Sequence, residues 1–196
     1  MKKNIISMKK NIISFFLLIF AFASACAAVN DENYTPYDFT EYIYKSTWEF
    51  EYETSEYFGN NKTKIAVLIK SFDELQILIT EEQKLSDEMN IKYPLIGTQP
   101  FMEKLRSYGE DFFENGMLVL VHCAAGSGSY DYQASRLYTS DGETVTFEIK
   151  NSSLPLPTNV GVTCDMAYFT FIAECEKTDA NAATYIITDK NGKLLY

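Results

Sequence analysis

The amino-acid sequence predicts an α+β fold, in which one main helix packs on a β-rich antiparallel sheet or curled sandwich. Three observations predict it: several segments alternate apolar and polar residues, Asp-Gly and Asn-Gly turns separate some of them, and one long segment has helical spacing. The composition agrees, because 46% apolar and 15% aromatic residues among 196 suffice for a packed core and exclude a disordered chain.

Residues 1–25 are predicted to be a signal peptide. Four lysines lie within the first ten residues, and the run from Ile12 to Ala28 carries no charge and ends in small residues. This run is shorter than the ~20 residues that a membrane-spanning helix needs. The heptapeptide MKKNIIS occurs at residues 1–7 and again at 8–14, so either Met1 or Met8 can be the start.

Cys26 changes the expected fate of the exported chain. The stretch Ala23-Ser24-Ala25-Cys26 resembles a bacterial lipobox, whose cysteine becomes the lipidated N-terminus of the mature protein. The alternative is cleavage after the Ala-x-Ala triplet and plain secretion. We expect lipid attachment at Cys26 on the outer face of the cytoplasmic membrane, a tether over 26–40 and a single β-rich globular domain over 41–196.

Removal of the signal peptide makes the protein more acidic. Four of the 17 basic residues and none of the 27 acidic ones lie before Ala28, so the mature chain has 13 basic residues and a charge of −14. This charge argues against nucleic-acid partners and against anionic lipid headgroups.

The first predicted elements of the domain are two strands. Trp48, Phe50 and Tyr52 alternate with glutamates, which indicates a strand whose aromatic face is more often core than ligand groove. A turn at Asn60-Asn61 and a strand over Ile65–Ile69 follow.

A main helix follows these strands. Ser71 and Glu74 have the spacing of a capping box, and apolar residues then recur at helical intervals to about Asn90. The core side is expected to hold Phe72, Leu75, Leu78 or Ile79, Leu85 and Met89, and the solvent side Glu81, Glu82, Asp87 and Glu88. A shorter helix is expected over Phe101–Tyr108.

The remainder of the chain reads as strands. Met117–Cys123 is apolar on both faces, as in a central strand, and Asp141-Gly142 joins a hairpin of 130–139 and 144–150. Met166–Cys175 is expected to direct Phe169, Phe171 and Cys175 to one face and Tyr168 and Ile172 to the other. Asn191-Gly192 is expected to close a last hairpin between 185–188 and 194–196.

Residues with catalytic or metal-binding chemistry are few. His122 and Cys123 are adjacent on a predicted strand and should point to opposite faces, so the only histidine is badly placed to activate the thiol. A single histidine without a close pair of cysteines disfavours a zinc site. The small-residue segment 124–129 resembles a phosphate-binding loop but lacks the lysine of a P-loop. We therefore expect no enzyme, no metal and no cofactor.

Three cysteines remain beyond Cys26. Cys123 is expected to pair with Cys175 or with Cys164, and buried free thiols are an equal alternative.

A family resemblance begins at Asp111-Phe112-Phe113-Glu114. The strand Met117–Val121, the Gly126–Ser129 loop, the 130–150 hairpin and Thr163–Tyr168 follow in an order that resembles secreted or lipid-anchored bacterial proteins. Their domain is similar to the C-terminal domain of a protease-complex accessory subunit (PrcB type), over about 112–177. That family usually has a Gly-Gly pair where this chain has Gly126-Ser127-Gly128. The resemblance implies a non-enzymatic interaction module that contacts another extracytoplasmic protein.

The sequence thus leaves two functional hypotheses. The first is a lipid-anchored interaction or accessory module of a bacterial cell-surface assembly, with a binding surface at Ser127, Gly128, Ser129 and Asp165. The second is a small-ligand or glycan-binding surface protein that uses Trp48, Tyr52 and neighbouring tyrosines.

Overall fold

A computed structural model describes residues 34–46, 64–88, 99–153 and 167–195. The chain divides between Tyr34 and Thr35, and the compact unit described below begins at Thr35. The predicted signal peptide with Cys26, the predicted strand at Trp48–Tyr52, and the segment with Cys164 and Asp165 all lie outside the described residues.

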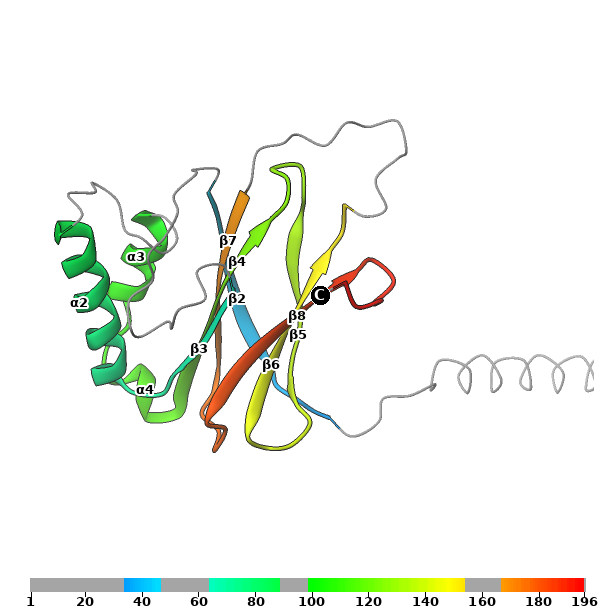
Figure 1. Ribbon diagram of the computed structural model, residues 1–196. Helices are drawn as coiled ribbons and strands as arrows, with labels where there is room; N and C mark the ends of the chain where they lie inside the picture. Colours follow the sequence, from blue (N-terminus) through cyan, green and yellow to red (C-terminus); the bar gives the residue numbers. More distant parts are fainter. Residues whose placement is uncertain (1–33, 47–63, 89–98, 154–166, 196) are drawn as a thin grey trace, which may run out of the picture. The chain divides into compact units, whose positions relative to one another are not determined.

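Two four-stranded sheets form the body of this unit (Figure 1). Sheet A has the order β1 (Thr35–Pro36), β5 (Tyr132–Thr139), β6 (Thr144–Asn151), β8 (Ala182–Asp189). Sheet B has the order β2 (Phe39–Ser46), β7 (Ala167–Glu176), β4 (Gly116–Ala125), β3 (Lys64–Ile69). Neighbouring strands are antiparallel except for β6 and β8, which run parallel.

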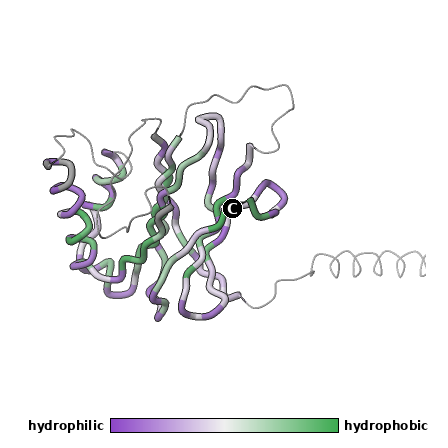
Figure 2. Tube along the Cα trace, viewed as in Figure 1, coloured by the Kyte–Doolittle hydropathy of each residue, from purple (hydrophilic) through white to green (hydrophobic). Residues whose placement is uncertain are grey.

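Sheet B is the central layer of three. The first core cluster joins alternate residues of β4 and β7 to the facing side of sheet A, with Val121, Phe171 and Phe147 fully buried. The intervening residues, among them Leu118 and Ile172, face α2 (Phe72–Glu88), α3 (Gln99–Arg106) and α4 (Phe112–Asn115) in a second cluster. Figure 2 shows apolar residues concentrated along these strands. Burial on both faces explains why the sequence of β4 is apolar throughout.

The main helix begins as the capping box predicts. The Glu74 N–H donates to the Ser71 hydroxyl at 3.2 Å, and the Glu74 carboxylate reaches back to accept the N–H of Lys70 at 2.6 Å. One expectation for its solvent face is wrong: Glu82 is buried. The reason is its position four residues after Leu78, which places both side chains on one face of the helix.

The β5–β6 hairpin is confirmed around Gly142, whose φ of 77° suits a residue without a side chain. The pairing of β8 differs from the expected all-antiparallel sheet. After β6 the chain enters sheet B as β7 and then returns to sheet A beside β6, and this return makes the two strands parallel. The last predicted hairpin is reduced to a bridge between Thr188 and Leu194.

The expected tether is too long at its C-terminal end. Pairing with β5 begins at Thr35, and Tyr37 and Phe39 pack against the first core cluster. The folded unit therefore includes residues 35–40, because their aromatic side chains are covered by sheet A.

The two described thiols are free and buried, so the expected disulfide between Cys123 and Cys175 does not form. Cys123 lies opposite Phe169, whereas Cys175 lies opposite Met117, six positions further along β4. At ~3.4 Å per residue the two cysteines are ~20 Å apart, well beyond disulfide reach. The alternative with Cys164 lies outside the described residues.

Candidate binding edge

Strand β2 is an edge of sheet B. It pairs with β7 over eight consecutive residues without a bulge or a proline, and no strand among the described residues pairs with its other side. Every residue from Phe39 to Lys45 is half-buried or exposed, whereas β7 beside it is almost entirely buried. We call the open side of β2 the binding edge, because unpaired backbone N–H and C=O groups on an edge strand can accept another strand.

One row of side chains along the binding edge faces the helices. Tyr42 and Tyr44 belong to it, and the Tyr44 ring meets Phe101 edge to face at 5.7 Å between centroids. The Lys104 ammonium of α3 lies 4.0 Å from the Tyr42 ring centroid and forms an ion pair of 2.9 Å with Glu174 of β7.

Glu174 joins this row to the end of α3. Its Oε1 also accepts the Tyr108 hydroxyl at 2.6 Å. Burial raises the pKa of Glu174, but the hydrogen bonds from Tyr108 and Lys104 outweigh burial and leave this pKa below its usual value. Burial and the neighbouring carboxylate raise the pKa of Tyr108. At neutral pH the Glu174 carboxylate is therefore ionised and the Tyr108 hydroxyl keeps its proton, which suits the hydrogen bond between them.

The other row faces sheet A. The Lys45 ammonium donates to the carbonyls of Gly128 at 2.6 Å and Tyr130 at 3.3 Å, and it lies 5.2 Å from the Phe169 ring centroid. Burial raises the pKa of Glu41, against the effect of a hydrogen bond from the backbone of Ala134 in β5. Ile43, between them, is 37% exposed and is one of three large apolar side chains classed as exposed within the described ranges.

The loop predicted as a binding surface lies at one end of this row. Gly128 contributes its carbonyl to Lys45, and Ser129 is exposed, as expected. Ser127 differs from expectation: it is 1% exposed, and its hydroxyl accepts the Ser129 N–H at 3.1 Å within the turn. Ser127 therefore shapes the loop and is not accessible to a partner, while Asp165 lies outside the described residues.

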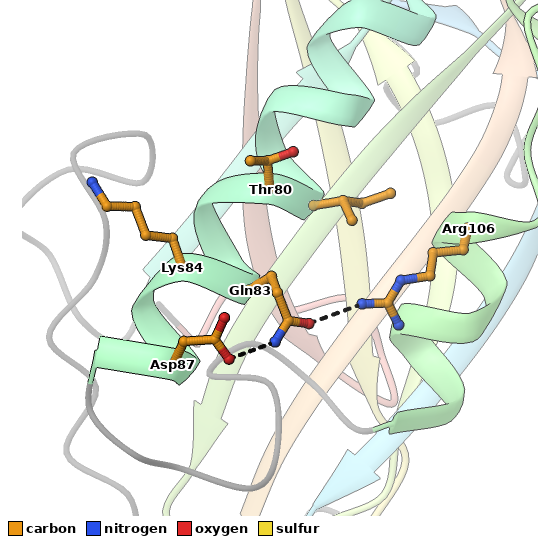
Figure 3. A pocket seen from close by; sticks show the side chains of 6 residues that line it. Thr80, Gln83, Lys84, Asp87 and Arg106 are labelled. Atoms are coloured by element: carbon orange, nitrogen blue, oxygen red, sulfur yellow. Dashed lines mark hydrogen bonds between the residues drawn. The ribbon is translucent and has the colours of Figure 1, made fainter.

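A hollow of about 470 Å³ lies between α2 and α3 (Figure 3). Arg106 of α3 donates to Gln83 of α2 at 3.4 Å, and Gln83 donates to Asp87, one turn later on α2, at 2.9 Å. The lining residues are Ile79, Thr80, Gln83, Lys84, Asp87 and Arg106. None of them is aromatic, so this hollow lacks the stacking platform expected of a glycan site. The glycan hypothesis stays a prediction based on Trp48 and Tyr52, which lie outside the described residues.

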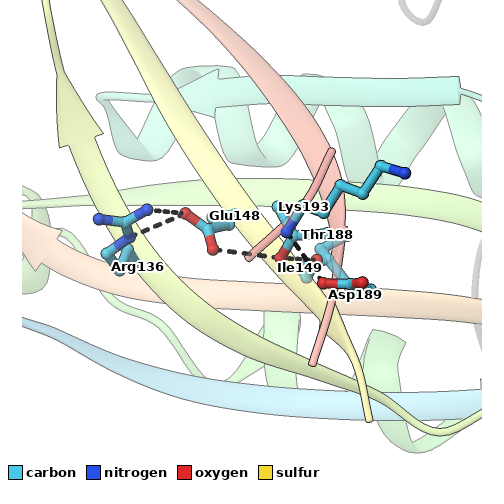
Figure 4. A network of polar contacts seen from close by, with 6 residues as sticks. All are labelled: Arg136, Glu148, Ile149, Thr188, Asp189 and Lys193. Atoms are coloured by element: carbon cyan, nitrogen blue, oxygen red, sulfur yellow. Dashed lines mark hydrogen bonds and ion pairs between the residues drawn. The ribbon is translucent and has the colours of Figure 1, made fainter. Parts of the chain in front are cut away.

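A polar network crosses the outer face of sheet A (Figure 4). Arg136 Nη2 lies 2.7 Å from a carboxylate oxygen of Glu148, and Thr188 donates to the other oxygen at 3.2 Å. These three residues come from β5, β6 and β8, and only 3% of Glu148 is exposed. The network joins three strands, and its partners account for the buried carboxylate.

His122 and Cys123 lie on opposite faces of β4, as predicted. Cys123 belongs to the core between the sheets, whereas His122 Nδ1 lies 2.9 Å from the Thr170 hydroxyl and its ring stacks on Tyr168. Burial lowers the pKa of His122 to about 4 and raises the pKa of Cys123 to about 12. This arrangement keeps both groups neutral and does not form a thiolate–imidazolium pair.

Among the described residues, no cluster of three or more potential metal ligands is found. Within the same residues, no helix has the length and apolar character to cross a bilayer. Comparison of the chain with protein-family models, curated proteins and solved structures gives no match. The resemblance to the PrcB-type accessory domain therefore stays a prediction from residues 111–168.

Proposed function

We propose that this protein is a lipid-anchored, extracytoplasmic and non-enzymatic interaction module of a bacterial cell-surface assembly. The observation that carries the proposal is the binding edge: an eight-residue edge strand whose residues from Phe39 to Lys45 are all half-buried or exposed. Strand addition to such an edge is a common means of protein recognition, in which the backbone supplies affinity and the flanking side chains supply specificity.

The side chains of β2 fit this role. Tyr42 and Tyr44 lie on the helix side of the binding edge, next to Lys104 of α3. On the side of sheet A, the exposed Ile43 lies between two charged residues, Glu41 and Lys45. Aromatic residues dominate the energy of protein interfaces, because they bury a large area at a small entropic cost. Internal contacts fix Lys45 and Lys104 in place, which reduces the entropy lost when a partner binds.

The proposed lipid on Cys26 sets how far the binding edge can be from a membrane. Eight residues separate Cys26 from Thr35, where the folded unit begins. A chain of that length spans at most ~30 Å, so an acylated Cys26 would hold the domain near the bilayer surface. The charge of −14 would disfavour direct contact with anionic headgroups and would leave the domain available to other proteins.

Site-specific photo-crosslinking in intact cells tests the interaction. A photoreactive amino acid replaces Thr40 on β2 or Thr184 on β8, two exposed threonines in strands. We expect position 40 to give discrete adducts and position 184 to give none. Equal adduct formation at both positions, or none at position 40, would contradict the proposal.

Metabolic labelling with radioactive palmitate tests the anchor. We expect the unaltered chain and a Cys164→Ala control to be labelled and to sediment with membranes. Cys26→Ala should lose the label and leave the membrane fraction. Retention of the label in Cys26→Ala would show that the anchor has been assigned to the wrong residue.

A further inference from the structure

The sequence of β2 is self-complementary when it is read in opposite directions from Ile43. Tyr42 and Tyr44 flank this residue, and Glu41 and Lys45 lie one position further out on either side. All five residues lie within the stretch that pairs with β7 without interruption.

We propose that two copies of this chain associate through β2, as antiparallel strands related by a twofold axis at Ile43. The two B sheets would then join into one continuous sheet across the dimer. This inference rests on the proposed role of β2 as the binding edge, and it names a second copy of the chain as an occupant. A twofold arrangement is expected for a homodimer, because the same patch serves both subunits.

The twofold register gives each facing pair within residues 41–45 a favourable combination of side chains. Glu41 faces the partner's Lys45, Tyr42 faces the partner's Tyr44, and Ile43 faces the partner's Ile43. Opposite charges, aromatic pairs and aliphatic pairs directly across antiparallel strands are each stabilising. Moving the axis to Tyr42 or to Tyr44 would place Ile43 opposite the partner's Glu41 or Lys45, so the side chains favour the register at Ile43 over its two neighbours.

The charged residues can form these pairs without giving up their contacts within the subunit. The Lys45 ammonium has three N–H groups, and the carbonyls of Gly128 and Tyr130 accept two of them. Glu41 accepts one backbone hydrogen bond from Ala134, which leaves carboxylate lone pairs available. Both side chains are exposed and lie on the same face of sheet B.

The aromatic row would continue across the dimer. Tyr42 and Tyr44 of each subunit lie on the helix side of sheet B, fixed by Lys104 and Phe101. The edge backbone adds roughly six to eight hydrogen bonds between the strands. Repulsion between two chains of charge −14 is screened beyond ~8 Å at physiological salt, so the local complementarity decides the contact. Anchoring of both copies on one membrane would raise their effective concentration.

Cysteine crosslinking tests the twofold axis. In antiparallel pairs the facing Cα atoms are ~4.5–5.5 Å apart, which a disulfide can bridge. Ile43→Cys is compared with Ile77→Cys, an isoleucine on α2 that is 50% exposed, in the full membrane-associated chain with Cys164→Ser. We expect disulfide-linked dimers for Ile43→Cys at ten times or more the yield of Ile77→Cys. Equal yields would overturn the proposal.

Charge exchange tests the register. In the Ile43→Cys chain, Glu41→Lys places lysine opposite the partner's Lys45, and Lys45→Glu places glutamate opposite the partner's Glu41. We expect each single variant to form roughly tenfold less crosslinked dimer with itself. Mixing the two variants under different epitope tags should restore the crosslink between them, because each mixed pair again has opposite charges. A mixture that crosslinks no better than either variant alone would overturn the register.

Two further measurements distinguish the possible reasons for a missing crosslink. One detects misfolded variants, and the other tests whether the binding edge contacts a different protein. Protection of the buried Cys123 and Cys175 from alkylation shows that a variant is folded. Position-40 adducts that contain another protein, without self-crosslinking at Ile43→Cys, would leave the binding edge in place and overturn the second copy as its occupant. Absence of both products would contradict both proposals.

Discussion

The buried imidazole of His122 should make folding stability depend on pH in a defined window. Burial lowers the pKa of His122 from 6.5 to about 4. In the unfolded chain the imidazole takes up a proton as the pH falls through about 6.5, whereas in the folded chain it stays neutral to about pH 4. The unfolded state therefore binds more protons between these values, and stability decreases as the pH falls through the window.

The magnitude follows from the width of the window. Each pH unit between the two pKa values costs about 1.4 kcal/mol, so this group lowers the free energy of unfolding by about 3 kcal/mol between pH 6.5 and pH 4. His122→Asn removes the titration and retains a hydrogen-bonding atom toward Thr170. The variant should be less stable than the unaltered protein at pH 7.5, because it leaves space in a packed region. By pH 4.5 its deficit should shrink by about 2–3 kcal/mol.

Urea unfolding followed by far-ultraviolet circular dichroism at pH 7.5, 6.5, 5.5 and 4.5 measures this difference. Carboxylates titrate in both proteins, so their contribution cancels in the comparison. Thr170→Val is the matched control, because it removes the hydroxyl beside Nδ1 and keeps the imidazole, so its pH dependence should follow that of the unaltered protein. The reasoning would be refuted if the free energies of unfolding of the unaltered protein and of His122→Asn, plotted against pH, ran parallel.

Three other predictions concern the scaffold. Arg136→Ala should lower the free energy of unfolding by about 2 kcal/mol, because it leaves the buried Glu148 without its cation. The double variant Arg136→Ala with Glu148→Gln should recover part of this loss, and thermal melts of both variants measure the difference. The thiols of Cys123 and Cys175, whose pKa values burial raises to about 12, should resist iodoacetamide at pH 8 and react rapidly in urea, as measured by mass spectrometry; rapid labelling in the native state would contradict their placement. Ser71→Ala should cost about 1 kcal/mol in urea unfolding through loss of the helix cap, and an unchanged midpoint would show that the Glu74 contact suffices.

The elements that sequence predicts well are those with local signals. The capping box at Ser71 begins α2, Asp141-Gly142 closes the β5–β6 hairpin, and the apolar run of β4 indicates burial on both faces. Each signal depends on residues close together in the chain. The secondary structure that each signal predicts therefore depends little on residues that are distant in the chain.

The features that sequence missed depend on distant partners. Residues 35–40 have a polar composition typical of a tether, yet pairing with residues of β5 and β7 that follow more than a hundred residues later makes them part of both sheets. The buried Ser127 likewise depends on contacts around a loop whose carbonyls bind Lys45 from β2. The candidate binding edge could not be located from sequence, because an edge is defined by which strand pairs with which.

The topology leaves β2 as an open edge of sheet B. Sheet B is covered by sheet A on one face and by helices on the other, so its edges hold its remaining unpaired backbone. At the far edge β3 lies against β8, and Lys70 just after β3 donates to the Ala180 carbonyl just before β8. At the near edge the chain crosses from sheet A to sheet B through Tyr37 and Asp38. Strand β7 pairs with one side of β2, and the described residues place no strand on its other side. A long open strand is an aggregation hazard unless its side chains select a partner. The complementary order of Glu41, Tyr42, Ile43, Tyr44 and Lys45 supplies that selection, since it favours one register with a second copy and disfavours its neighbours.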